Sequence, residues 1–203
     1  MMKKMNLPNK LTILRILLVP VCMILIMLPI PSMFPNLDVW QRIIAAALFL
    51  LISLTDMLDG MIARRKNLVT NFGKFLDPLA DKFLVIGVLM ALFIKSREFD
   101  PVFPVVLVFA TTIIVMRELA VTSLRLLVSS SSGEVIAAKW LGKIKTVTQM
   151  VCIMTILLEP IVLGDFGKYH LLSYLTIILM TLMTVWSGYD YIKGYWKFLD
   201  SSV

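Results

Sequence analysis

The amino-acid sequence predicts an all-α integral membrane protein with six transmembrane helices, preceded by an amphipathic N-terminal segment. Hydrophobic residues make up 59% of the 203-residue chain, and the mean hydropathy is +0.90. This composition is typical of a membrane protein rather than of a soluble core. Apolar stretches long enough to cross a bilayer as helices are distributed along the chain. We therefore expect residues 1–203 to form a single membrane domain.

The expected spans follow from these apolar stretches, taken in order. They are Leu11–Leu28, Val39–Ser53, Phe83–Ile94, Val102–Val121, Ile144–Val162 and Leu171–Ser187. The second and third are short for a bilayer, so we expect both to continue as helices out of the membrane into the segment that joins them. The amphipathic segment before the first span is expected to lie on the membrane surface and to present Asn9, Thr12 and Arg15.

The distribution of basic residues predicts the orientation. Six spans place both termini on one side, and all Lys and Arg residues fall on that side except Arg42, Lys95, Arg97 and Lys168. The positive-inside rule assigns this side to the cytoplasm. The net charge of +7 is then explained by orientation and by attraction to anionic lipids and substrates. Nucleic acid is not an expected partner, because the chain has no soluble basic domain to hold it.

Four aspartates lie at helical spacing between the second and third spans. One helix face carries Asp56, Asp59, Gly60 and Ala63, with Arg64 beside them, and the next carries Gly73, Asp77 and Asp81. Carboxylates beside a bilayer are costly and indicate function, and bound Mg²⁺ or Mn²⁺ is the expected compensation. If the two helices are antiparallel neighbours, the aspartates converge in one pocket. The alternative is a solvated acidic loop, but a loop requires no helical phase between its acids.

The pattern Asp-x2-Asp-Gly-x2-Ala-Arg-x8-Gly-x3-Asp-x3-Asp, from Asp56 to Asp81, resembles the signature of the CDP-alcohol phosphotransferases. These are integral membrane enzymes of phospholipid synthesis. Residues 6–20 and 117–149 look like the corresponding parts of bacterial phosphatidylglycerophosphate synthases, so the resemblance covers nearly the whole chain. It implies transfer of the phosphatidyl group of CDP-diacylglycerol to glycerol 3-phosphate, with release of CMP. It also implies a homodimer in a bacterial cytoplasmic membrane, with the active site facing the cytoplasm.

The same resemblance implies roles for individual residues. Two Mg²⁺ or Mn²⁺ ions would be held by Asp56, Asp59, Asp77 and Asp81, and Asp81 would also be the catalytic base. Gly60, Ala63 and Arg64 would line the CMP moiety of CDP-diacylglycerol. Further contacts with this substrate are expected from Asn9, Thr12, Arg15, Thr70 and Gly73.

A glycerol 3-phosphate acceptor requires a second cationic site for its phosphate. The candidates are Arg117, Arg125, Lys139, Lys143 and Lys145, which lie on the cytoplasmic side. Each could instead be a membrane anchor or a snorkelling side chain. Glu118 lies among them and needs a partner, for which Arg15 and Arg125 are the candidates. An interfacial aromatic belt is predicted from Trp186, Tyr189, Tyr191, Tyr195 and Trp196.

Two other functions remain compatible with these patterns. The same chemistry could use another alcohol, such as phosphatidylglycerol, inositol phosphate or serine. A divalent-cation transporter would use the four aspartates as its ion site. Transporter sites lie near mid-membrane, however, whereas these acids fall at the expected ends of spans, and Arg64 among them suits an anionic ligand better than a cation path.

Overall fold

The computed structural model describes residues 7–29, 35–65, 71–132 and 140–200, and within these ranges it consists of helices and short connections. The long helices are α1 (Leu7–Met27), α2 (Pro35–Arg65), α3 (Asn71–Lys95), α4 (Phe103–Ser132), α5 (Trp140–Val162) and α6 (Leu171–Asp200). Two short 3₁₀ helices, η1 (Ser96–Glu98) and η2 (Gly164–Tyr169), follow α3 and α5. The all-α prediction is confirmed for the described part of the chain.

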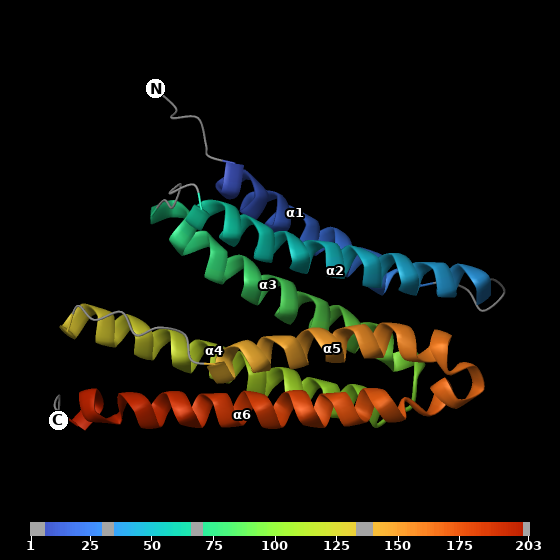
Figure 1. Ribbon diagram of the computed structural model, residues 1–203. Helices are drawn as coiled ribbons and strands as arrows, with labels where there is room; N and C mark the ends of the chain where they lie inside the picture. The colour runs from blue at the N-terminus through green and yellow to red at the C-terminus, as the bar shows by residue number, and fades with distance from the viewer. Residues whose placement is uncertain (1–6, 30–34, 66–70, 133–139, 201–203) are drawn as a thin grey trace.

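The helices form an antiparallel bundle in two groups (Figure 1). In the first group α1 packs against both α2 and α3, and in the second α6 packs against both α4 and α5. Contacts of α3 with α4 and of α2 with α5 join the groups. The start of α1, the end of α2, the start of α3, the end of α4, the start of α5 and the end of α6 all lie at one end of the bundle (Figure 1). We call this the signature end, because the acidic signature lies there.

Within the part of the chain that the structure describes, five helices (α1, α2, α4, α5 and α6) contain stretches long and apolar enough to cross a membrane. α3 carries the second half of the acidic signature. As expected, the short second and third spans continue as helix: α2 runs for 31 residues, or about 46 Å at 1.5 Å per residue. This exceeds a hydrocarbon core of about 30 Å. α4 continues as helix past the expected span end at Val121 to Ser132, and its residues Thr122 and Arg125 contact α3 and α6.

The bundle interior is apolar and closely packed. Its largest buried side chains include Phe49, Leu89, Leu107 and Ile153. Gly87 allows α3 to approach α1, because a Cβ at that position would lie 2.9 Å from Sδ of Met23. Nearer the start of both helices, Thr12 and Arg15 of α1 contact Asp77 and Asp81 of α3.

Carboxylates fix the helix starts at the opposite end of the bundle. Glu159, at the end of α5, accepts hydrogen bonds from the backbone N–H groups of Leu172 (2.9 Å) and Ser173 (2.7 Å) at the start of α6. Asp100 accepts from the N–H groups of Val102 (2.6 Å) and Phe103 (3.0 Å) at the start of α4. Such bonds satisfy the orphan donors of a helix N-terminus. This end is therefore held by bonds from side chain to backbone.

His170 is buried at the same end, between η2 and α6. Its ring stacks on Phe99 with 3.9 Å between centroids, and its backbone adopts the left-handed conformation with φ of 50°. Burial lowers the pKa of His170 below its ordinary value of 6.5, against the opposing charge of Glu159, and the charge of Arg42 adds to the lowering. The folded protein therefore favours the neutral imidazole.

Candidate active site

The described aspartates of the signature contact the start of α1. Asp77 and Asp81 lie one turn apart on α3. The Thr12 hydroxyl donates a hydrogen bond to Oδ1 of Asp77 at 2.9 Å, and Nη1 of Arg15 lies 3.8 Å from Oδ1 of Asp81. The Arg15 side chain is fully buried, whereas that of Asp81 is 54% exposed. Thr12 and Arg15, two of the expected substrate-binding residues of α1, thus contact the signature aspartates.

The rest of the signature is described only in part. α2 is helical through Arg65 and α3 begins at Asn71, so the helical phase expected of both halves is confirmed. The side chains of Asp56, Asp59, Gly60, Ala63 and Arg64 lie outside the described residues, as do Thr70 and Lys139 altogether. Gly73 is buried on α3, and Asn9 is buried on α1. The roles expected of all these residues stay predictions.

The donor chemistry of the signature fits a hard divalent cation. All four predicted ligands are carboxylates, the group that Mg²⁺ and Mn²⁺ prefer. Two of them, Asp77 and Asp81, share one face of α3, so their oxygens can serve one site. No cluster of three or more potential metal-binding side chains occurs among the side chains that the structure describes, a set that lacks Asp56 and Asp59.

A cavity of about 590 Å³ opens beside Asp81, mainly between α3, α4, α5 and α6. Its volume lies within the range of about 300–1,000 Å³ that is usual for small-molecule sites. Its charged and hydroxyl-bearing lining includes Asp81, Lys82, Arg117, Glu118, Thr122, Arg125, Lys143, Lys145 and Thr146. Four of the five basic residues expected to bind the acceptor phosphate thus line one cavity together with a signature aspartate.

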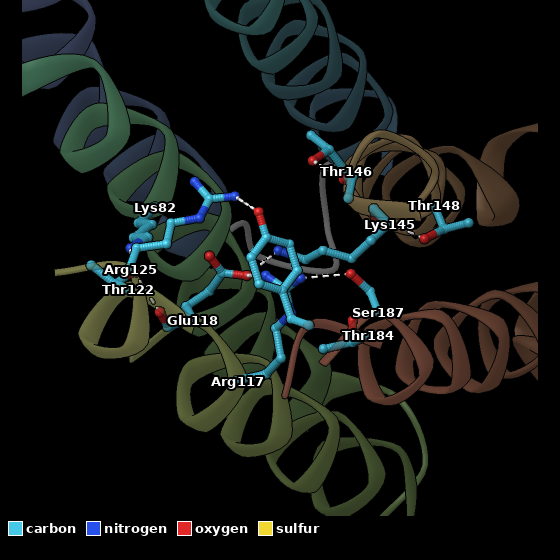
Figure 2. Close-up of polar contacts among 12 residues, drawn as sticks. Lys82, Arg117, Glu118, Thr122, Arg125, Lys145, Thr146, Thr148, Thr184 and Ser187 are labelled. Atoms are coloured by element: carbon cyan, nitrogen blue, oxygen red, sulfur yellow. Dashed lines mark hydrogen bonds and ion pairs between the residues drawn. The ribbon is translucent and has the colours of Figure 1, made fainter. Parts of the chain in front are cut away.

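Glu118 is the centre of the charged network in this cavity (Figure 2). Its Oε1 accepts hydrogen bonds from Nζ of Lys145 on α5 and from Nη1 of Arg117, the latter at 3.1 Å. The predicted pairing of Glu118 with Arg15 or Arg125 is therefore wrong. Arg15 lies on α1 beside Asp81, and Arg125 lies two turns further along α4, where it contacts Tyr191.

Two polar residues of the cavity were not expected from the sequence. Nζ of Lys82 donates to the hydroxyl of Thr122, which in turn donates to the Glu118 backbone carbonyl at 2.6 Å. Lys82 directly follows Asp81 on α3, the helix that carries the second half of the signature. That adjacency was the available sequence signal.

The aromatic belt prediction is wrong for two residues and stays a prediction for the other three. Trp186, Tyr189 and Trp196 are exposed, but Tyr191 and Tyr195 are buried against α4 together with Val121 and Val128. Helical phase separates the two sets, because Ser187, Tyr191 and Tyr195 recur every four residues on one face of α6.

Comparison with known proteins agrees with these observations. The family model described as CDP-alcohol phosphatidyltransferase matches residues 5–186. A Bacillus subtilis protein named CDP-diacylglycerol–glycerol-3-phosphate 3-phosphatidyltransferase is 41% identical, with 97% of this chain and 98% of the relative aligned. Proteins of the same name from Rickettsia bellii (36% identical, 95% and 97% aligned) and Yersinia enterocolitica (31% identical, 96% and 97% aligned) are also similar over nearly their full lengths.

Proposed function

This chain belongs to the CDP-alcohol phosphatidyltransferase family, and from that premise we propose that it transfers the phosphatidyl group of CDP-diacylglycerol to glycerol 3-phosphate. The products are phosphatidylglycerophosphate and CMP. The reaction serves the synthesis of anionic phospholipid. Both substrates are named in the relatives that this chain resembles over nearly its whole length.

One observation carries the choice of acceptor: Asp81 and a group of cations line the same cavity. A phosphate monoester carries up to two negative charges and needs such a group to leave water. Arg117 and Lys145 are the best placed, because Glu118 orients both toward the cavity through charged hydrogen bonds. The exposed Asp81 carboxylate is then available to the hydroxyl at the other end of the same small molecule.

The chemistry assigned to these residues is an in-line displacement. Asp81 accepts the proton of the acceptor hydroxyl, and the hydroxyl oxygen attacks the phosphorus that bears the diacylglycerol. The bond from that phosphorus to the bridging oxygen of the pyrophosphate breaks, and CMP leaves with the electron pair. Asp56, Asp59, Asp77 and Asp81 would hold two divalent cations, Mg²⁺ or Mn²⁺, which neutralise charge on the pyrophosphate.

The CDP-diacylglycerol site is assigned by family resemblance. Arg64 would bond a phosphate through its planar guanidinium, and Gly60 and Ala63 would leave space for the nucleotide. Asn9, Thr70 and Gly73 would complete the site. Thr12 and Arg15 support the assignment indirectly, because their contacts with Asp77 and Asp81 hold α1 against the signature.

The protein is a multi-pass membrane protein, and the remaining question is its orientation in the membrane. We place the signature end at the cytoplasmic face of a bacterial inner membrane, since the bias of basic residues favours that orientation. Labelling with a membrane-impermeant thiol reagent tests this orientation, at cysteines introduced in place of Ser129 at the signature end or of Asp165 at the opposite end. A homodimer stays a prediction of the family resemblance.

The direct test measures CMP release by purified protein in detergent with CDP-diacylglycerol, with and without glycerol 3-phosphate, in Mg²⁺ or Mn²⁺. We expect release that requires both the metal and glycerol 3-phosphate. Release that instead depends on phosphatidylglycerol, inositol phosphate or serine would keep the family and change the acceptor. An absence of release with every alcohol would contradict the proposal and favour divalent-cation transport.

A further inference from the structure

Tyr191 on α6 connects the two arginines that α4 contributes to the cavity. Its hydroxyl accepts a hydrogen bond from Nη2 of Arg125. Its ring lies under both guanidinium groups, with Cζ of Arg125 4.9 Å and Cζ of Arg117 5.8 Å from the ring centroid. The side chain is 1% exposed and also lines the cavity. A single aromatic side chain thus contacts two cations that face the same space.

The same face of α6 also contacts and makes room for the Arg117 side chain. Ser187 accepts a hydrogen bond from Nη2 of Arg117 at 2.6 Å, and both residues appear in Figure 2 with the side chains directed toward each other. Gly188 leaves room for the arginine, because a Cβ there would lie 3.1 Å from Cγ of Arg117. Tyr195 stacks on Tyr191 with 5.4 Å between ring centroids. We call Ser187, Gly188, Tyr191 and Tyr195 the arginine cradle.

We propose that Tyr191, supported by the rest of the arginine cradle, is a positioning residue that sets the affinity for the acceptor phosphate through Arg117 and Arg125. This inference rests on the proposed function, because it takes the cavity to be the acceptor site. A long arginine side chain loses much rotamer freedom when it binds a ligand. A hydrogen bond and a ring face that hold the guanidinium beforehand reduce that loss.

The contacts of Tyr191 divide its contribution into two parts that substitutions can separate. Tyr191→Phe removes the hydrogen bond to Arg125 but keeps the ring under both arginines and its stacking on Tyr195. Tyr191→Leu removes the ring as well. The matched control is Tyr189→Phe, which deletes the same hydroxyl two residues away on a side chain that is 65% exposed.

The experiment measures CMP release against glycerol 3-phosphate at saturating CDP-diacylglycerol, together with competitive inhibition by inorganic phosphate. We expect Tyr191→Phe to raise the KM for glycerol 3-phosphate by about three- to tenfold, the equivalent of one net hydrogen bond. Tyr191→Leu should raise it further, to roughly 10- to 50-fold. The inhibition constant of phosphate should rise in parallel. The KM for CDP-diacylglycerol and the behaviour of Tyr189→Phe should stay within about twofold of the unsubstituted protein.

A purely structural role for Tyr191 predicts a different pattern. The melting temperature would then fall, and kcat and both KM values would change together. That pattern, or an unchanged phosphate inhibition constant in Tyr191→Phe, would overturn the inference. Arg117→Gln and Arg125→Gln separate the two levels of the argument. If they raise the acceptor KM and Tyr191→Phe does not, only the positioning role fails. If they too leave it unchanged, the cavity is not the acceptor site and the positioning role fails with it, whereas the proposed transfer to glycerol 3-phosphate fails only if CMP release does not require glycerol 3-phosphate.

Discussion

Replacing Lys145 by methionine tests the acceptor site most directly. Lys145 is buried on α5, lines the cavity and donates to Glu118, and methionine keeps the length of its apolar stem. A charge-assisted hydrogen bond to phosphate contributes about 1.5–3 kcal/mol, which corresponds to a factor of about 10–150 in affinity. We therefore expect the KM for glycerol 3-phosphate to rise by about 10- to 100-fold, with a change of less than about twofold for CDP-diacylglycerol.

The partner of Lys145 makes the test sharper. In Lys145→Met the Glu118 carboxylate loses one of the two cationic side chains that the structure shows hydrogen-bonded to it and keeps the other, Arg117, so more of its negative charge acts on the incoming phosphate. At about 6 Å and an effective dielectric constant of about 20–80, that repulsion amounts to roughly 1–3 kcal/mol.

The double variant Lys145→Met/Glu118→Gln should therefore recover part of the lost affinity, about five- to tenfold in KM. The assay is CMP release over a series of glycerol 3-phosphate concentrations. If the losses of glycerol 3-phosphate affinity caused by Lys145→Met and by Glu118→Gln simply add in the double variant, Glu118 does not face the phosphate. An unchanged acceptor KM in Lys145→Met alone would remove Lys145 from the site.

Three further outcomes test other parts of the molecule. Asp81→Asn should abolish CMP release while CDP-diacylglycerol binding persists, and substantial residual turnover would exclude Asp81 as the base. Glu159→Gln should lower the melting temperature in detergent, at a cost of about 1–3 kcal/mol for the weakened bonds to the start of α6, without a change in either KM; an unchanged melting temperature would contradict the capping role. Because the pKa of His170 is lowered on folding, the unfolded chain binds more protons, so its contribution to stability is present above about pH 6.5 and is lost as the pH falls toward the folded pKa. His170→Asn, which tolerates the left-handed backbone, should flatten the melting temperature between pH 7 and pH 5, and an unaltered slope would assign that pH dependence to other groups.

The helical phase of the acidic signature could be predicted from the sequence because it depends on local spacing alone. The continuation of the second and third spans as helix followed from the shortness of their apolar stretches. The partners within the cavity could not be predicted in this way. Lys143 and Lys145 are two residues apart and chemically identical, yet Lys145 is buried against Glu118 whereas Lys143 is exposed, near the ring of Trp140. What separates them is the position of α4, which is set by packing across the whole bundle.

The aromatic residues of α6 illustrate the same limit. Composition near the end of a span predicts an interfacial belt, and Tyr189 fits that prediction. Tyr191 differs from it only in facing α4, and its two arginine contacts involve residues 66 and 74 positions away in the chain. Helical phase could have separated the two tyrosines. The identity of the partner helix could not be read from periodicity, because periodicity gives a face and not its neighbour.

The two ends of the bundle use carboxylates in opposite ways, and this difference bears on where a ligand can act. Glu159 and Asp100 bind backbone N–H groups that start α6 and α4, and no ligand can take the place of a helix N-terminus without unravelling it. At the signature end, Glu118 and Asp81 contact the side chains of Lys145, Arg117 and Arg15. Long side chains can change partners by rotation, so an anionic substrate can share Lys145 and Arg117 with Glu118 while the helices keep their packing. The signature end is therefore suited to exchange charged ligands during turnover. The bonds at the opposite end hold the helices in place while it does so.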